Sequence, residues 1–489
     1  MPSLSKFQMV KKNKFYVTTP IYYVNSAPHI GSAYTTIAAD ILARWNKLQG
    51  NDVFFLTGTD EHGQKIQQIA EEAGLKPKEF VDDIAKKFKE TFKLLNISND
   101  NFIRTTDEKH IKEVKKILQE LYDKKLIYKG IYEAYYCVGC EQYKTKQELI
   151  DGKCPLHKRE PQIIKEESYI FKLSSFQDKL LKLIKSDKYL ISPQKRKNEV
   201  ISFIEEGLKD ISISRLKSKV NWGIELPFDK EHTCYVWIDA FWNYVTGLDT
   251  KKDFDKFWSP DIQLMANDIL RVHATIWPAL LLALNYELPK KLFVHGYFTI
   301  NGEKMSKSLG NVISPLYLID KYSVDTLRYY LMRKIVFGED GDFSEEALKE
   351  SHNNELANKW GNLVSRVAAL AEKCSLEETT PLNSKILIKK TQALIENLEL
   401  DKALNEIFSF IDQLNEYIQS KKPWETHDKK VLYQLVNGIK DASILLSPFM
   451  PETSEKIAKI FNFEISLKSL NESIKISKIK KVDILFKKV

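Results

Sequence analysis

The residues Pro28-His29-Ile30-Gly31-Ser32 stand between a stretch rich in β-forming residues and a stretch with helical periodicity. The N-terminus of a helix offers free N–H groups and the positive end of a dipole, so this junction suits a triphosphate. Gly31 would let a phosphate approach the backbone, and His29 and Ser32 lie three residues apart on one helical face. An ordinary helix start also explains so short a motif, which by itself assigns no function.

A second segment, Lys304-Met305-Ser306-Lys307-Ser308, carries two lysines around small polar residues in the sequence FTINGEKMSKSLGN. Two flexible cationic side chains that follow a glycine turn can hold phosphate groups through charge-assisted hydrogen bonds. A solvated basic loop is the alternative interpretation. We favour a phosphate clamp formed by Lys304 and Lys307.

Cys137 and Cys140 form one pair with a two-residue spacer. After thirteen intervening residues, Cys154 and His157 form a second pair with the same spacer. Two such pairs can close a tetrahedral zinc knuckle, and four protein ligands leave no open position, so the Zn²⁺ would be structural. Five cysteines with three of them clustered indicate a reducing compartment and one metal site rather than a disulfide framework. The alternatives are thiols without metal and a redox Cys-x-x-Cys, for which no thioredoxin-like pattern is present.

The first part of the chain predicts the elements that would position these groups. Residues 14–23 (KFYVTTPIYY) predict a buried strand, and residues 29–47 predict a helix with apolar side chains at helical spacing. Residues 52–56 predict a second strand, and residues 57–63 a polar turn. Strand, helix and strand in this order form a βαβ unit, so we expect a doubly wound parallel sheet.

Later segments predict further parts. Residues 130–171 contain short aromatic and cysteine-bearing stretches, which we interpret as an insertion into the α/β pattern. Residues 234–238 (CYVWI) and 291–299 predict strands of the resumed sheet. From residue 344 to residue 461 the pattern is almost wholly helical, which predicts a helical bundle after the α/β part.

Length and composition set broad limits. A chain of 489 residues predicts about two to four domains. The formal net charge of +8 permits a polyanionic partner, but a solvated Lys-rich surface explains it equally well. No apolar run reaches the roughly 18 residues that would span a bilayer, so we expect no membrane partner. Residues 1–14 lack the apolar segment of a secretion signal, and we expect a cytoplasmic protein.

The pairing of the first motif with a distant KMSKS segment resembles the class I aminoacyl-tRNA synthetases. Five segments, in the same order, resemble the methionine-specific branch: TTPIYYVNSAPHIGSAYTTIAADILARW, TGTDEHG, YVWIDAFWNY, DILRVHATIWPALL and FVHGYFTINGEKMSKSLGNV. The sequence is therefore identified as a member of the methionyl-tRNA synthetase family over residues 14–461. The resemblance implies a ligase that activates methionine with ATP, loads it onto the 3′-terminal adenosine of the methionine tRNA, initiator included, and releases AMP and pyrophosphate.

The resemblance also implies a methionine pocket. Asp60 would hold the substrate ammonium by a charge-assisted pairing, and Tyr23 and His273 would place polar groups near the sulfur. A thioether is polarizable and forms only weak hydrogen bonds, so the remaining wall should be apolar and polarizable. That wall would consist of Ile21, Trp237, Ala240, Tyr244, Ile276 and Trp277. Core packing remains the alternative for each aromatic residue taken alone.

For the nucleotide, the resemblance implies that Asp268 binds the ribose and that His295 and Gly296 line the adenine side. The implied catalytic groups are His29, Lys304 and Lys307, which would offset negative charge while the methionine carboxylate attacks the α-phosphorus. Mg²⁺ would accompany ATP. The full set expected to bind ATP is His29, Gly31, Ser32, Asp268, His295, Gly296, Lys304 and Lys307.

In the helical part, GNLVSR (361–366) and Lys422-Pro423-Trp424 resemble the anticodon-reading positions of the family. Asn362 and Arg366 are four residues apart on one helical face, from which they could reach base edges. Trp424 could stack on an unpaired base. A capped core tryptophan is the alternative for Trp424 in isolation.

The implied architecture is an α/β Rossmann-like catalytic domain with a doubly wound parallel sheet, a zinc-knuckle insertion and a C-terminal α-helical bundle. The expected divisions are 1–117 and 234–303 for the two catalytic halves, 118–233 for the connective insertion, 304–350 for the KMSKS loop and stem-contact region, and 351–489 for the helical anticodon-binding domain. No further tRNA-binding, dimer-forming domain follows, so we expect a monomer.

Two positions depart from the family pattern. Ser32 stands where a second histidine is common, and Ala266-Asn267 stands where Gly-Lys is usual, so we expect activity with weaker ATP binding. A synthetase for leucine, isoleucine or valine would need a large editing insertion that this length does not accommodate. A cysteine enzyme would carry its zinc in the amino-acid pocket. A catalytically inactive tRNA-binding homologue is the alternative from another functional class.

Overall fold

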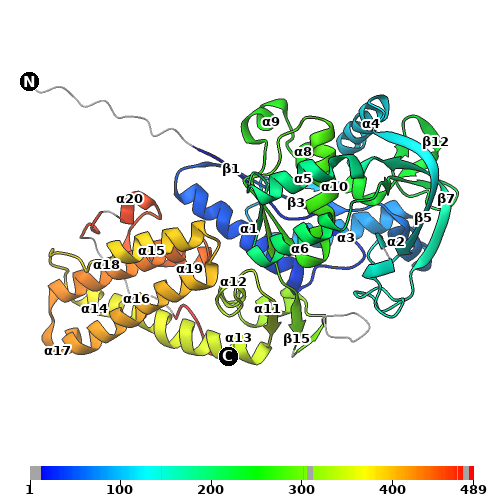
Figure 1. Ribbon diagram of the computed structural model, residues 1–489. Coiled ribbons are helices and arrows are strands. Elements are labelled where there is room, and N and C mark those ends of the chain that lie inside the picture. The colour runs from blue at the N-terminus through cyan, green and yellow to red at the C-terminus, as the bar shows by residue number, and fades with distance from the viewer. Residues whose placement is uncertain are drawn as a thin grey trace, which may run out of the picture.

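The structure, a computed structural model, describes residues 13–144, 146–300, 302–304, 312–470, 472–476, 479 and 484–489. Its α/β part is built on a seven-stranded sheet in which every ladder is parallel (Figure 1). The strand order is β2-β3-β1-β13-β14-β8, and β4 also pairs with β3. The strands are β1 (Lys14–Thr18), β2 (Tyr22–Tyr23), β3 (Asp52–Asp60), β4 (Asn101–Arg104), β8 (Leu190–Ser192), β13 (Ile262–Ala266) and β14 (Lys291–His295).

Strand β1 lies at the centre of this sheet. It pairs with β3 on one side and, on the other, with β13, which lies more than 200 residues away in the sequence. The chain order of the strands reverses at this point, and a crevice opens there at the carboxyl ends of the strands. The fold therefore provides a ligand site at the ends of β1, β3, β13 and β14.

Helices follow or connect these strands. The first is α1 (Ile30–Leu48), whose buried side is packed against β1, β3 and β13. The other helices of the α/β part and its insertion are α2 (Gln64–Glu72), α3 (Pro77–Leu94), α4 (Glu108–Asp123), η1 (Lys146–Glu148), η2 (Leu173–Phe176), α5 (Gln177–Lys185), α6 (Gln194–Glu205), α7 (Val236–Phe241), α8 (Asn243–Thr246), α9 (Lys251–Phe257), η3 (Asn267–Ile269) and α10 (Leu270–Ala283).

An antiparallel insertion separates the two halves of the parallel sheet. Its two long strands, β5 (Ile127–Cys137) and β7 (Gln162–Phe171), form a ladder at one end of the molecule (Figure 1). The shorter strands are β6 (Gln142–Lys144), β9 (Ile211–Ser212), β10 (Ser214–Leu216), β11 (Glu225–Leu226) and β12 (Asp229–Cys234). The cysteine pairs lie in the segment that runs from Cys137, the last residue of β5, past β6 to the start of β7.

The chain then forms a small sheet and a helical part. The small sheet contains β15 (Phe298–Ile300), β16 (Glu303–Lys304) and β17 (Gly341–Phe343). The helices that follow are α11 (Pro315–Lys321), α12 (Val324–Arg333), α13 (Glu345–Ser351), α14 (Asn362–Lys373), α15 (Lys385–Glu396), α16 (Leu400–Lys421), α17 (Pro423–Thr426), α18 (Lys429–Leu446), α19 (Pro451–Phe461) and α20 (Leu467–Leu470). Between α13 and α14, the segment η5 (His352–Gly361) is wound as a π-helix.

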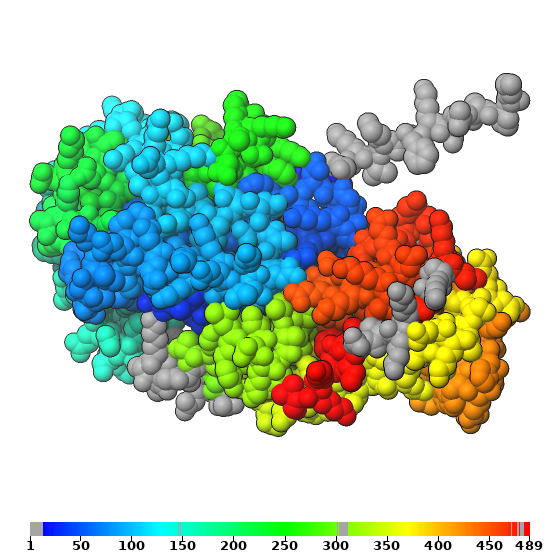
Figure 2. Space-filling view, turned by 180° about the vertical axis from the view of Figure 1, so that it is seen from behind, coloured from blue at the N-terminus to red at the C-terminus, as the bar shows by residue number. Residues whose placement is uncertain are grey.

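The helical part lies beside the α/β part, and the C-terminal segment lies where the two meet (Figures 1 and 2). One hydrophobic core runs from α1 into the helical bundle, and a second core lies under the insertion and α10. The guanidinium of Arg328 is fully buried at the junction, where it donates to Asp40 Oδ2 at 2.6 Å and to the carbonyls of Phe449, Pro448 and Leu95. A buried ion pair thus joins α1 to α12, and the same guanidinium ties both to the turn after α18.

The structure confirms the α/β class, the parallel sheet and the helical C-terminal part, and it corrects four local predictions. The strand predicted over residues 291–299 is divided into β14, in the parallel sheet, and β15, in the small sheet. The first predicted strand is divided at Pro20 into β1 and β2. The predicted turn after residue 56 is wrong, because β3 continues to Asp60. The predicted strand over residues 234–238 is also wrong: Cys234 ends β12 and the next apolar residues form helix α7. Among the described residues, no helix has the length and apolar character to cross a bilayer.

Candidate active site and metal centre

A cavity of about 460 Å³ lies at the carboxyl ends of the central strands. Its walls come from segments that are far apart in the sequence, so the fold brings together most of the residues expected to bind substrate. Those expected residues in the wall are Ile21, Tyr23, His29, Gly31, Ser32, Asp60, Trp237, Ala240, Tyr244, Asp268, His273, His295 and Gly296.

His29 is the N-cap of α1 and has an extended backbone. Its Nδ1 accepts a hydrogen bond from the Gly31 N–H at 3.1 Å. Ser32 completes a capping box: its hydroxyl donates to the His29 carbonyl at 2.7 Å and accepts from the His29 N–H at 3.1 Å. The Ser32 hydroxyl therefore holds the His29 backbone in place, and both of its hydrogen bonds are made inside the first turn of α1.

His295, at the end of β14, is buried and makes hydrogen bonds with both ring nitrogens. Nε2 is 2.7 Å from the Thr35 hydroxyl on α1, and Nδ1 is 2.8 Å from the Gly296 carbonyl. Burial lowers the pKa of His295 to about 4, so the ring is neutral at pH 7, with Nδ1 as donor and Nε2 as acceptor. His295 thus ties β14 to α1. A side chain at Gly296 would collide with Asp340, since a Cβ there would lie 2.4 Å from the Asp340 backbone nitrogen.

Asp60 ends β3 and faces the cavity, and its Oδ1 is buried without a hydrogen-bond partner among the described residues. Burial raises the pKa of Asp60 well above its usual range, and the nearby carboxylates of Asp239, Glu141 and Glu61 raise it further. A buried carboxylate without a cation is costly. A ligand that brings a positive charge to this position would remove that cost.

The opposite side of the cavity is aromatic. His273 on α10 lies edge-on to Trp237 and Phe241, with ring centroids 6.1 and 5.0 Å apart. Its Nε2 is 2.9 Å from the Tyr244 hydroxyl and its Nδ1 is 2.9 Å from the Ile269 carbonyl. Burial lowers its pKa to about 4, so His273 is neutral and fully hydrogen-bonded. This wall is apolar and polarizable.

Trp277 is not among the described residues that line the cavity. It is fully buried, stacks on the far side of Phe241 at 5.7 Å and donates from Nε1 to Gln263 at 3.2 Å. Phe241 lines the cavity in front of it. Trp277 is therefore placed to support the pocket wall from behind.

Sequence reasoning missed the buried network around Asp239. Asp239 on α7 accepts from His62 Nδ1 at 2.6 Å and from His110 Nε2 at 2.8 Å, and His110 Nδ1 is 2.7 Å from the Thr246 hydroxyl. Burial opposes the charge on Asp239, but the two histidines outweigh it and lower its pKa. The network holds α7, which carries Trp237 and Ala240, against the loop after β3 and against α4. The available signal was that Asp239 is the one charged residue in the apolar and aromatic run YVWIDAFW.

Sequence reasoning also missed Glu141, which directly follows Cys140 and lines the cavity. Burial raises the pKa of Glu141 to about 7. Its Oε1 accepts from the Lys65 N–H at the start of α2 at 2.6 Å, and its Oε2 has no hydrogen-bond partner of normal geometry among the described residues. Treating the cysteine pairs as purely structural left this carboxylate unnoticed.

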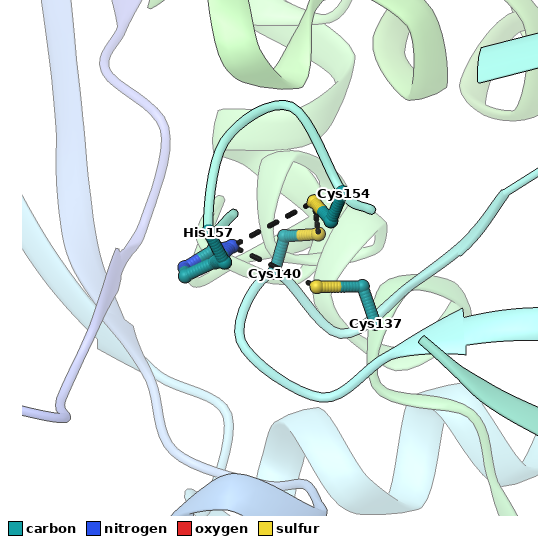
Figure 3. Close-up of side chains that lie close together, drawn as sticks. All are labelled: Cys137, Cys140, Cys154 and His157. Carbon is teal, nitrogen blue, oxygen red and sulfur yellow. Dashed lines mark hydrogen bonds between the residues drawn. The ribbon is translucent and has the colours of Figure 1, made fainter. Parts of the chain in front are cut away.

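Cys137, Cys140, Cys154 and His157 point toward one another (Figure 3). Their ligand atoms all lie within 4.8 Å of each other, with Cys140 Sγ and Cys154 Sγ 4.0 Å apart and Cys137 Sγ and His157 Nδ1 3.7 Å apart. Around a tetrahedral zinc, sulfur ligands at about 2.3 Å would be separated by about 3.8 Å. A Cβ at Gly139 would lie 2.5 Å from the His157 ring, so glycine is needed there. The cluster fits one structural zinc ion.

The KMSKS segment is only partly described. Lys307 and the side chain of Lys304 lie outside the described residues, while the backbone of Lys304 belongs to β16. The chain after this segment returns to the cavity, because the Ile313 carbonyl accepts the Ile30 N–H at 3.1 Å at the start of α1. The chain that follows the segment therefore lies next to the cap formed by His29.

A second, open groove lies in the helical part between η5, α14 and α16. Asn362 and Arg366, two of the residues expected to read bases, line it. The Arg366 guanidinium lies over the Trp424 ring at 5.1 Å from its centroid, so all three expected residues gather at one place. The complete lining is Asn358, Lys359, Asn362, Arg366, Asp412, Asn415, Glu416, Gln419 and Ser420.

The parallel sheet with a capped helix start at its crevice is joined to a helical part with its own polar groove, and comparison with known families assigns both parts to class I tRNA synthetases. The family model described as "tRNA synthetases class I (M)" matches residues 15–162 and 145–368, and the model described as "Anticodon-binding domain of tRNA ligase" matches residues 384–486.

The methionine–tRNA ligase of Clostridium acetobutylicum is 44% identical to the chain over 98% of the chain and 79% of that protein. That of Streptomyces coelicolor is 40% identical over 93% of the chain and 91% of that protein. The solved structure of Mycobacterium tuberculosis methionyl-tRNA synthetase with methionyl-adenylate superposes with a TM-score of 0.92, at 33% identity, over 97% of the chain and 99% of that chain. The chain belongs to the methionine–tRNA ligase family.

Proposed function

We propose that this protein ligates methionine to the methionine tRNA in two steps at the cavity beside the carboxyl ends of β1 and β3. The observation that carries the proposal is that one cavity contains both the capped start of α1 and the buried carboxylate of Asp60, whose Oδ1 has no hydrogen-bond partner among the described residues. The first feature suits the phosphates of ATP, and the second suits the ammonium of an amino acid. The distance between two substrates bound at these positions would be short, as a bimolecular step requires.

In the first step, an oxygen of the methionine carboxylate attacks the α-phosphorus of ATP. The bond between the α-phosphorus and the oxygen that bridges the α- and β-phosphates breaks, and pyrophosphate leaves. His29 is proposed to donate to the phosphates from Nε2, since its Nδ1 is occupied by the Gly31 N–H. Asp268 is proposed to bind the ribose, and His295 and Gly296 to border the adenine. Lys304 and Lys307 are proposed to neutralise the departing phosphates, and ATP would bind as its magnesium complex.

In the second step, a hydroxyl of the tRNA terminal adenosine attacks the carbonyl carbon of methionyl-adenylate, and AMP leaves. The tRNA is proposed to be selected at the helical groove, where Asn362 and Arg366 would contact base edges and Trp424 would stack on an exposed base. Initiator and elongator methionine tRNAs are both proposed substrates. We further propose that the protein acts in the cytoplasm as a monomer.

Methionine would be distinguished at the aromatic side of the cavity. The ammonium is proposed to bind Asp60, and the side chain to extend toward Trp237, Ala240 and His273, with Ile21, Tyr23 and Tyr244 completing the wall. Trp277 would act from behind Phe241. A neutral His273 whose nitrogens are both occupied leaves a soft surface, which a thioether can contact without losing hydrogen bonds.

Exchange of labelled pyrophosphate into ATP, measured with each of the twenty amino acids, tests the proposal. Exchange that depends on methionine is the expected result. Exchange with another amino acid and none with methionine would overturn it. The comparisons lend no support to the alternative of an inactive homologue.

Comparing the ATP KM of Ser32→His with that of the parent tests the departure at this position. Because the Ser32 hydroxyl completes the capping box of α1, we expect Ser32→His to lose that contact and to change the KM.

A further inference from the structure

Three buried polar groups meet at the end of the cavity nearest the metal centre, and together they are called the polar corner: the Tyr23 hydroxyl, Asp60 Oδ1 and Glu141 Oε2. The Tyr23 hydroxyl and the Glu141 carboxylate interact with each other. Apart from that contact, none of these three atoms has a hydrogen-bond partner of normal geometry among the described residues, so the corner holds more acceptors than donors. All three side chains line the cavity. Buried polar atoms without partners are rare and costly, which points to a ligand that supplies the missing donors.

The members of the polar corner are close neighbours. Tyr23 and Asp60 are directly paired across strands β2 and β3. A Cβ placed on Gly63 would lie 2.3 Å from Glu141 Oε2 and 2.9 Å from the Tyr23 hydroxyl, so both oxygens lie close to the same point. Gly63 has a φ of +113°, in the region that favours glycine, and it leaves this space open.

Glu141 is held in the polar corner by both its side chain and its backbone. Oε1 accepts from the Lys65 N–H at 2.6 Å, which directs Oε2 into the cavity. The Glu141 carbonyl accepts from the Tyr235 hydroxyl at 2.5 Å and from Trp237 Nε1 at 3.1 Å. Glu141 also follows the metal-site residue Cys140 without an intervening residue. The position of the metal loop therefore sets the position of this carboxylate and of the Trp237 ring beside it.

The chemistry of the polar corner suits one small cation with several donors. Carboxylate oxygens accept, a primary ammonium has three N–H donors, and charged hydrogen bonds between them are short and strong. The neighbouring Lys65 ammonium donates to the Gly139 carbonyl at 2.9 Å, so it is directed to the metal loop. Resting on the proposed function, we propose that Glu141 is a second ligand of the substrate ammonium, beside Asp60, and that the metal centre places it there.

The test measures binding rather than catalysis. L-Methioninol keeps the ammonium and the thioether of methionine, and 4-(methylthio)butanol lacks the ammonium; both are titrated calorimetrically into the zinc-loaded protein. In Glu141→Gln, the Kd of methioninol is expected to rise about tenfold or more, as for loss of a charged hydrogen bond. The Kd of 4-(methylthio)butanol, and the ATP KM in pyrophosphate exchange, should change less than about twofold, roughly the noise of such comparisons. Glu167→Gln, an exposed change in the same insertion, should bind both compounds as the parent does.

A cycle with zinc removal tests the second half of the proposal. Chelation should weaken methioninol binding by the parent, and should weaken that of Glu141→Gln much less, since the contact is already lost. If Glu141→Gln loses zinc or its cooperative thermal transition, Glu141→Asp is used instead. This change keeps the negative charge but places the carboxylate one methylene further from the ligand, so the Kd of methioninol should be intermediate. Unchanged methioninol binding by Glu141→Gln, or equal loss for both compounds, would overturn the proposal. Methionine-dependent exchange by the parent would leave the proposed function intact in that case, whereas its absence would reject both.

Discussion

Replacing Asp60 by asparagine is expected to weaken methionine binding and to stabilise the free protein at the same time. In the free protein the Asp60 carboxylate is buried, and its Oδ1 has no partner among the described residues. A hydrogen bond between a carboxylate and an ammonium contributes roughly 1.5–3 kcal/mol. Since about 1.4 kcal/mol corresponds to a factor of ten, the KM for methionine should rise about 10- to 150-fold.

The stabilisation follows from the direction of the pKa change. Burial, and then Asp239, raise the pKa of Asp60 above the unfolded value of 3.8. A carboxyl whose pKa is raised in the folded state costs stability when it is charged, by about 1.4 kcal/mol for each pH unit between the folded and unfolded pKa values. Below the unfolded pKa the cost disappears. The side chain of the Asp60→Asn variant is not charged at any pH, so the gain should be present at neutral pH and vanish as the pH falls toward the unfolded pKa of the carboxyl.

Pyrophosphate exchange at varied methionine concentration gives the KM, and thermal unfolding at neutral and acidic pH gives the stability. Asp83→Asn, an exposed change on α3, is the matched control and should alter neither quantity. An unchanged methionine KM in Asp60→Asn would refute the ammonium assignment. A lower melting temperature at neutral pH would refute the argument that the free site carries an uncompensated charge.

Three further outcomes are expected. Arg328→Met should lower the free energy of unfolding in urea by about 3–5 kcal/mol, because it breaks the fully buried ion pair with Asp40, which then keeps, among the described residues, only the pairing with Arg44, and removes the donor of three carbonyls. The exposed change Lys334→Met should cost little, and equal losses would contradict this. Cys154→Ser should reduce bound zinc, measured by elemental analysis, well below one ion per chain, and Cys374→Ser should retain it. Arg366→Ala should lower kcat/KM for tRNA charging by about 5- to 150-fold, which corresponds to the roughly 1–3 kcal/mol of a lost base contact, and leave pyrophosphate exchange unchanged; an equal fall in exchange would place Arg366 outside tRNA recognition.

The sequence predicts the features that depend on local periodicity or on motif spacing. The helix starting after His29, the parallel sheet and the four-residue metal cluster are of this kind, since spacing alone limits their geometry. The strand predicted over residues 234–238 is wrong because a short apolar run suits either a strand or a helix. Helix α7 forms there because Asp239 must be buried against His62 and His110, which come from distant parts of the chain.

The unpredicted parts of the site depend on contacts between segments far apart in the sequence. Glu141 has no local pattern that marks it as a pocket residue, because its position is fixed by Lys65, Tyr235 and Trp237. The resemblance places Trp277 at the pocket surface. Its position behind Phe241 depends on the stacking of two rings from different helices, which residue order does not reveal.

The π-helical segment η5 ends directly before Asn362. A π-helical turn contains one residue more than an α-helical turn, while its backbone groups remain hydrogen-bonded. The wider turn rotates the backbone by less per residue than the roughly 100° of an α-helix. If the same residues of His352–Gly361 were wound as an ordinary helix, Asn362 and Arg366 would therefore face in another direction relative to α13. In this segment, the number of residues matters as much to base recognition as their identity.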